Sequence, residues 1–176
     1  MRLSLVKILQ ICGYSNSGKT TLVNKVVNKL TKEKRQVFTI KHHGHGGKPS
    51  INDEKDSSQH IKNGAIGSLV EGEGRILLQL ENGYKSLKQQ IQIVSFFEPD
   101  IIIIEGHKRE AYPKVVLIRD KSELELVKSL TNIQLVILWK KELEPLIETE
   151  IKIVNLEKEE QVLNEISNIL NGDEVI

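Results

Sequence analysis

A glycine-rich turn between an apolar run and a helical pattern constrains this chain more than any other feature. Residues 13–20 read Gly-Tyr-Ser-Asn-Ser-Gly-Lys-Thr, which matches the phosphate-binding pattern G-x-x-x-x-G-K-[ST]. The apolar run 5–12 before it predicts a buried strand, and apolar residues at helical spacing after it predict a helix from about Lys19. Such a loop directs backbone N–H groups and a helix N-terminus at one point, where a phosphate binds.

The residue types of the loop suggest a role for each part. The Lys19 ammonium would reach the β- and γ-phosphates, and the Thr20 hydroxyl would ligate Mg²⁺. We therefore expect nucleotide binding by the whole segment, which consists of Gly13, Tyr14, Ser15, Asn16, Ser17, Gly18, Lys19, Thr20 and Thr21.

The rest of the chain alternates between strand and helix patterns. Strands are expected at 36–41, 66–70, 75–80, 100–105, 115–118, 135–139 and 151–154, and helices at 53–63, 86–97, 121–130 and near the C-terminus, where Gly172 would cap the last one. This rhythm predicts an α/β fold, a doubly wound and mostly parallel sheet of the P-loop NTPase type. The link 71–74 predicts a β-hairpin extension.

Length and composition are typical of one compact domain. The chain has 176 residues, of which 39% are apolar and 28% charged, and its net charge of +1 gives no indication of nucleic-acid binding. Cys12, the single cysteine, is expected to be a core thiol. No apolar stretch is long enough to span a membrane, and the N-terminus has no signal-peptide pattern. We expect one nucleotide-binding domain over residues 1–176, located in the cytoplasm.

Charged residues gather where the predicted strands end. Glu105 ends the strand 100–105, which is apolar on both faces as a central parallel strand must be. A carboxylate in that place can hold Mg²⁺ beside the phosphate loop. Asp100 begins the same strand, at the far end of the sheet, so we expect it to be structural.

Two further groups of residues are candidates for the site. Asp56 lies in the first turn of a predicted helix, where the helix dipole alone favours an acid, but it could also be a second Mg²⁺ or water-positioning carboxylate. His42 and His43, with His45, lie in a Gly-rich stretch after the second strand. Zinc is one interpretation, but a structural zinc site needs four N or S donors, so contact with phosphate or substrate is preferred. Lys108, Arg109 and Arg119 could bind further anionic groups.

Five motifs in this order resemble those of the MobB family, the molybdopterin-guanine dinucleotide biosynthesis adapter proteins. They cover residues 5 to about 120, and the final 55 residues carry no matching motif. The segments are 13–22, Ile-Lys-His-His-Gly-His-Gly at 40–46, Lys-Asp-Ser at 55–57 with Gly-Ala at 64–65, Val-Glu-Gly at 70–72, and Ile-Ile-Glu-Gly-His-Lys-Arg-Glu at 103–110 followed by Tyr-Pro-Lys at 112–114.

The resemblance implies a GTP- and Mg²⁺-binding protein with at most weak GTPase activity. Such a protein assists the attachment of GMP to molybdopterin beside a nucleotidyltransferase partner. The resemblance also implies a homodimer, in which residues 70–80 could supply a joining hairpin. Lys19, Asp56 and Glu105 would be the catalytic residues, with Thr20, Glu105 and Asp56 at the metal, and His42 and His43 would help to bind the nucleotide.

Base selection is not explained by any known motif. The guanine-reading pattern Asn-Lys-x-Asp is missing from the sequence, and the strand end at 139–142 is where base recognition is expected, with Glu142 as one acceptor for guanine. Two other functions therefore stay open. A small-molecule kinase would transfer the ATP γ-phosphate with Asp56 as base, and a metal-delivery GTPase would use the histidines.

Overall fold

The computed structural model describes residues 6–44, 47–49, 56–81 and 86–172. They form two compact units, residues 1–42 with 91–176 and residues 43–90. Helix α3 (Leu87–Ser95) spans the sequence boundary between them. No helix in the described ranges is long and apolar enough to cross a membrane.

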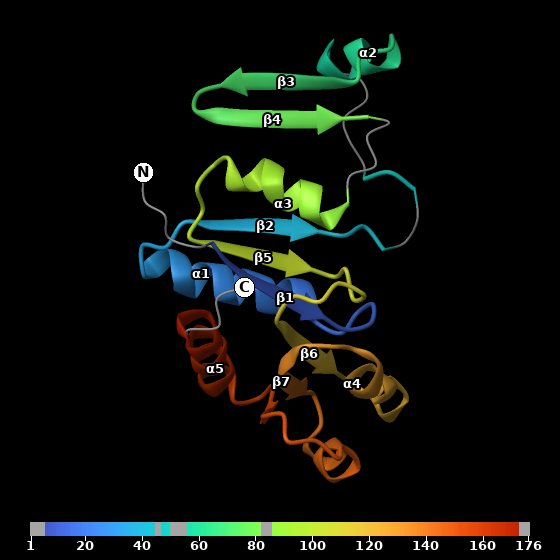
Figure 1. Ribbon diagram of the computed structural model, residues 1–176, viewed down its shortest axis with the longest axis vertical. Helices are drawn as coiled ribbons and strands as arrows, with labels where there is room; N and C mark the ends of the chain where they lie inside the picture. Colours follow the sequence, from blue (N-terminus) through green and yellow to red (C-terminus); the bar gives the residue numbers. More distant parts are fainter. Residues whose placement is uncertain (1–5, 45–46, 50–55, 82–85, 173–176) are drawn as a thin grey trace. The chain divides into compact units, whose positions relative to one another are not determined.

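The first unit contains a sheet of six strands in the order β2-β5-β1-β6-β7-β8 (Figure 1). All neighbouring strands run parallel, so their carboxyl ends lie along one edge. The strands are β1 (Lys7–Cys12), β2 (Val37–Lys41), β5 (Ile101–Glu105), β6 (Lys114–Ile118), β7 (Ile133–Leu138) and β8 (Ile153–Asn155). The predicted parallel α/β sheet is confirmed.

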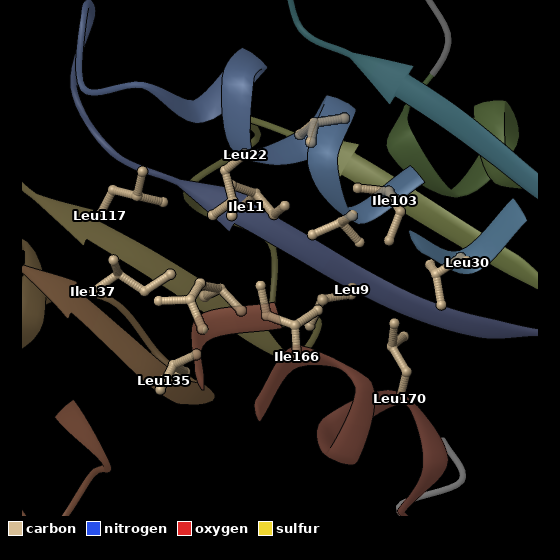
Figure 2. Close-up of a cluster of buried hydrophobic side chains, with 14 of the residues drawn as sticks. Leu9, Ile11, Leu22, Leu30, Ile103, Leu117, Leu135, Ile137, Ile166 and Leu170 are labelled. Atoms are coloured by element: carbon tan, nitrogen blue, oxygen red, sulfur yellow. The ribbon is translucent and has the colours of Figure 1, made fainter. Parts of the chain in front are cut away.

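Helices cover both faces of this sheet. On one face, α1 (Lys19–Lys32) and α5 (Glu159–Asn171) pack on the strands, and the core between them joins side chains from both helices and five strands, several of which are labelled in Figure 2. On the other face, α4 (Glu125–Ser129) and the 3₁₀ segment η2 (Lys141–Leu146) contribute to a second cluster around Val116 and Val136. Alternate residues of β6 and β7 point into the two clusters, as expected for strands buried on both faces.

The second unit holds a two-stranded antiparallel sheet and helix α2 (Asp56–Lys62). Strands β3 (Gly67–Gly72) and β4 (Arg75–Leu80) pair from Gly67 with Leu80 to Gly72 with Arg75. Glu73 and Gly74 connect them with φ of 48° and 77°. Positive φ at both central residues is typical of a type I′ turn, whose twist suits a hairpin. The predicted hairpin is therefore present.

One segment differs from the sequence prediction. The helix expected at 121–130 is split into the 3₁₀ turn η1 (Lys121–Glu123) and the short α4. The Glu123 carboxylate accepts a hydrogen bond of 2.7 Å from the backbone N–H of Arg119, and this bond ties the first turn back to the end of β6. The cap expected at Gly172 is confirmed: this residue is the C-cap of α5, with an extended backbone (φ −64°), and its N–H donates to the Asn168 carbonyl oxygen at 2.9 Å.

Candidate functional site

The phosphate loop joins β1 to α1 through a backbone that few residue types can adopt. Gly18, directly before the helix, has φ of 85°, and Asn16 has φ of 61°. A Cβ on Gly13 would lie 2.5 Å from Ser17 Oγ and 3.0 Å from the Leu117 carbonyl oxygen. Ser17 itself is fully buried. The glycines of the pattern are thus required by conformation and by close approach.

Trp139, at the end of β7, supports the loop from the side. Its indole Nε1–H donates a hydrogen bond of 2.9 Å to the Ser17 carbonyl oxygen. The ring also lies against Gly18, since a Cβ there would be 3.1 Å from Trp139 Cζ2. The turn is therefore held by a side chain 122 positions away in the sequence.

The Lys19 ammonium folds back over the loop. It donates hydrogen bonds to the Tyr14 carbonyl oxygen, at 2.5 Å, and to Ser17 Oγ, at 3.4 Å. Burial lowers the pKa of Lys19, although the nearby Glu105 carboxylate opposes that shift. A cation in partly buried surroundings interacts more strongly with an anion than one in water.

Thr20, Glu105 and Lys41 meet at the carboxyl ends of β5 and β2. The Thr20 hydroxyl donates to Glu105 Oε1 at 2.8 Å. Lys41 Nζ donates to the same oxygen at 2.6 Å and to Thr20 Oγ1 at 2.9 Å. Lys41 and Glu105 are register partners on adjacent strands. A positive charge therefore already lies between the hydroxyl and the carboxylate that were predicted to hold a metal.

This donor set fits Mg²⁺. The ion prefers oxygen ligands, and proteins commonly bind it through one or two carboxylates together with substrate phosphates. Thr20 and Glu105 supply a hydroxyl and a buried carboxylate beside the phosphate loop, and the Lys41 ammonium is a stand-in cation that contacts both oxygens.

The segment after β5 is fixed by buried polar side chains. Gln10 Nε2 donates to the carbonyl oxygens of Gly106 and His107 at 3.1 and 2.9 Å. Lys114, fully buried at the start of β6, donates to the carbonyl oxygens of Glu110 and Tyr112, and burial lowers the pKa of Lys114. These bonds hold the segment that follows Glu105.

His42 packs against His107 within this part of the site. The two ring centroids are 4.7 Å apart. Burial, followed by the proximity of His42, lowers the pKa of His107. Gly106 allows this contact, because a Cβ there would lie 3.1 Å from His42 Cβ. Of the predicted histidines, His42 is therefore adjacent to the segment that follows Glu105.

Two cations flank the phosphate loop. Lys108 Nζ lies 3.9 Å from the centroid of the Tyr14 ring, a cation–π arrangement. Arg119 Nη1 donates to the Asn16 carbonyl oxygen at 3.4 Å, and Arg119 Nε donates to Asp120 Oδ2 at 3.0 Å. Both cations were candidates for anion binding in the sequence, and the structure places them beside the loop, whereas Arg109 is exposed.

Not all predicted site residues are brought together by these contacts. Asp56 begins α2 in the second unit, and His43 belongs to the same unit, so their roles at the nucleotide stay predictions. His45 lies outside the described residues. Within the described part of the chain, no group of three His, Cys, Asp or Glu side chains could hold a metal ion. Asp100 accepts a hydrogen bond from the Gln36 N–H at 2.7 Å, consistent with its expected structural role.

Sequence reasoning missed the contacts of Lys41 and Trp139. Lys41 was visible only as one residue after a strand, and its contact depends on β2 lying next to β5. The pattern around Trp139 predicted a place for base recognition but gave no sign of its hydrogen bond to the loop.

Fold and loop together define a P-loop nucleotide-binding type of α/β protein. The profile of the family MobB, "Molybdopterin guanine dinucleotide synthesis protein B", matches residues 8–139. The chain belongs to the MobB family.

Individual relatives agree with this assignment. A Bacillus subtilis protein described as a probable molybdopterin-guanine dinucleotide biosynthesis adapter protein is 37% identical over 136 residues, which cover 77% of this chain and 78% of the relative. The crystal structure of Bacillus subtilis MobB superimposes with a TM-score of 0.80 at 31% identity, covering 95% of this chain and 99% of that one. The crystal structure of a MobB homologue from Bacillus stearothermophilus superimposes with a TM-score of 0.74 at 27% identity, covering 93% of this chain and 97% of that one.

The packing of Trp139 on Gly18 can be tested by substitution. We expect Gly18→Ala to lower the free energy of unfolding by about 1–2 kcal/mol, because the left-handed backbone penalises a Cβ. It should also shift the fluorescence of Trp139, the only tryptophan, because the new methyl group pushes against the indole. Gly64→Ala is the control, since Gly64 has φ of 104° and no atom of the described residues lies within 4 Å of its Cβ position. An unshifted spectrum in Gly18→Ala would contradict the contact.

Proposed function

We propose that this protein binds Mg²⁺-GTP and acts as an adapter in molybdopterin-guanine dinucleotide biosynthesis. The observation that carries the proposal is the phosphate loop with Thr20 hydrogen-bonded to Glu105, in a chain of the MobB family. The names of its relatives support the adapter role. Its partners would be the nucleotidyltransferase that joins GMP to molybdopterin, or the pterin itself.

Phosphate binding would use the loop amides and Lys19. The N-cap residue of α1, Gly18, has no side chain to cap the first turn, and the backbone donors and dipole of the helix favour an anion at that end. Lys19 would exchange the Tyr14 carbonyl oxygen for the β- and γ-phosphates. His42, His43 and Asp56 remain candidates for closing over the γ-phosphate, as parts of one nucleotide-binding domain.

Mg²⁺ would be held by Thr20 and Glu105. When bound, the ion would neutralise charge on the β- and γ-phosphates. Lys41 contacts both of these side chains, so it would have to leave the two oxygens as the metal arrives. The ammonium would then be free to face the phosphates.

Hydrolysis would be slow without a partner. Fast P-loop enzymes orient water with a glutamine and stabilise the transition state with an arginine. Arg119 contacts the loop, but its guanidinium is bonded to Asp120 and to the Asn16 carbonyl oxygen. A weak GTPase agrees better with an adapter than with a metabolic enzyme.

Nucleotide binding is tested by titrating Mg²⁺-GTP and Mg²⁺-ATP calorimetrically into the wild type and Lys19→Ala. We expect Lys19→Ala to abolish binding and to keep the fold, because it removes the phosphate-binding cation from a partly exposed side chain. A preference for GTP of about tenfold or more, about 1.4 kcal/mol, supports the adapter. Equal affinities or an ATP preference favour the kinase, and unchanged affinity in a folded Lys19→Ala contradicts the role of the loop.

The metal site is tested with Lys41→Met. Removing the competing ammonium should lower the Mg²⁺ concentration needed for half-maximal GTP binding by about fivefold, since a partly exposed ion pair contributes about 1 kcal/mol. Lys32→Met, an exposed substitution at the end of α1, is the control. A higher Mg²⁺ requirement in Lys41→Met would show that the lysine assists the metal instead of competing with it.

We further propose that the hairpin joins two copies of the chain. Successive strand residues face opposite sides, and the pairing of β3 with β4 puts four large apolar side chains on one face. All four are exposed, with 48–61% of each residue accessible: Leu69, Ile76, Leu78 and Leu80. Exposed apolar patches of this kind mark protein interfaces, and an isolated two-stranded sheet needs further packing to be stable.

A charge on that face should separate the copies. We expect Leu78→Asp to convert a dimer to a monomer in sedimentation velocity, because dimerisation would bury the carboxylate in an apolar interface. Gln79→Asp changes the opposite face of the same strand and should leave the dimer intact. A wild type that sediments as a monomer at all concentrations would refute the hairpin dimer.

A further inference from the structure

A small cavity adjoins the phosphate loop on the side of β1 opposite Glu105. Its volume is about 150 Å³, and its walls include Gly18 and Thr21 from the loop and α1. Trp139 and Leu156, which directly follow β7 and β8, form another part of the wall. In the sheet, β5 lies on one side of β1, whereas β6, β7 and β8 lie on the other. Glu105 and the cavity are thus on opposite sides of β1, whereas Thr20 and Thr21 are neighbours in the first turn of α1.

This arrangement predicts how a bound nucleotide would be oriented along the loop. If Thr20 and Glu105 take the metal and the terminal phosphates, as in the proposed function on which this inference rests, the chain of phosphates runs along the loop amides. Its other end then leaves near Gly18 and Thr21, where the cavity opens. A nucleoside attached there reaches Trp139.

The cavity suits one flat aromatic group. Cavities of about 150 Å³ can hold a single ring system, whereas whole drug-sized ligands need about 300 Å³ or more. Trp139 is anchored through its Nε1–H to the loop and is still 40% exposed. Stacking of a base on an aromatic side chain contributes about 1–3 kcal/mol.

The charged part of the lining is an ion pair. Lys25 Nζ and Glu159 Oε2 are 2.5 Å apart, and both side chains are about half exposed. The pair offers an ammonium donor beside carboxylate acceptors. The guanine edge presents O6 as acceptor and N1–H and N2–H₂ as donors, which complement an ammonium and two carboxylate oxygens. Adenine offers only the N6 amino group and the N1 acceptor on that edge, so it makes fewer contacts.

Other carboxylates at this edge are less suitable. The Asp120 carboxylate already accepts hydrogen bonds from Lys140 and Arg119, both at 3.0 Å. Glu142, which the sequence suggested as a guanine acceptor, is exposed on η2 and is not among the residues that line the cavity.

We propose that this cavity binds the purine base of the nucleotide, with Trp139 beside the ring and the Glu159 carboxylate and Lys25 ammonium selecting guanine. The proposal supplies a base-reading site to a chain that lacks the Asn-Lys-x-Asp motif.

The test exchanges one acceptor for one donor. Glu159→Gln replaces a carboxylate oxygen by an amide that can donate to the extra carbonyl of xanthine but repels the guanine amino group. GTP, XTP, ATP and inorganic tripolyphosphate are titrated, each with Mg²⁺, into the wild type and into Glu159→Gln. We expect GTP affinity to fall and XTP affinity to rise, each by about tenfold or more, while tripolyphosphate affinity stays unchanged. Trp139 fluorescence should respond to GTP beyond its response to tripolyphosphate.

Two control variants make the outcome specific. Glu160→Gln changes the neighbouring exposed glutamate, and Glu142→Gln changes the alternative acceptor; both should keep the wild-type preference. If the wild type binds GTP but Glu159→Gln keeps the same ratio of GTP to XTP affinity, the base site is wrong and the proposed function stands. A change from GTP to XTP preference in Glu142→Gln would also overturn the proposed base site. If the wild type binds neither tripolyphosphate nor any nucleotide, the proposed function fails first, and the base site with it.

Discussion

The parallel pairing of β5 with β1 is the constraint on which the rest of the site depends. Its register sets Glu105 opposite Ile11, just before the strand opens into the phosphate loop. Successive residues of a strand point to opposite faces of the sheet, so a shift by one residue would turn Glu105 to the face away from α1. The observed register brings the carboxylate within 2.8 Å of the Thr20 hydroxyl.

The phosphate loop has an unfavourable backbone conformation that contacts with neighbouring residues must stabilise. Left-handed conformations at Asn16 and Gly18 are costly or restricted to few residue types, and the Ser17 carbonyl oxygen would lack its partner without Trp139. The indole satisfies that oxygen and also contacts Gly18. Trp139, directly after β7, thus supports the phosphate loop although it is not part of the G-x-x-x-x-G-K-[ST] pattern. Residues outside a motif can therefore be required for the geometry of the motif.

Much of the fold and part of the site could be predicted from the sequence. The same physical reasons explain why the rest could not be predicted. A buried apolar run such as 101–105 is enough to predict a central strand. Parallel strands have their carboxyl ends at the same edge of the sheet, where ligands bind, so Glu105 could be placed beside Lys19 and Thr20. Local sequence patterns do not determine which strands are neighbours in a sheet, so the pairing of Lys41 with Glu105 was not predicted. The split of the 121–130 helix was equally hidden, because it depends on one side-chain hydrogen bond from Arg119 N to Glu123.

Lys41 explains how a chain with a buried carboxylate at the proposed metal site can fold without a metal. An uncompensated buried charge costs several kcal/mol, and Glu105 is 8% exposed. The ammonium of Lys41 compensates this charge at 2.6 Å from a side chain that is itself half exposed, so it can leave with little loss of burial. The ion pair that stabilises the free protein is thus the one that the proposed Mg²⁺ binding would displace. It is tight enough to compensate the buried carboxylate and exposed enough to be displaced.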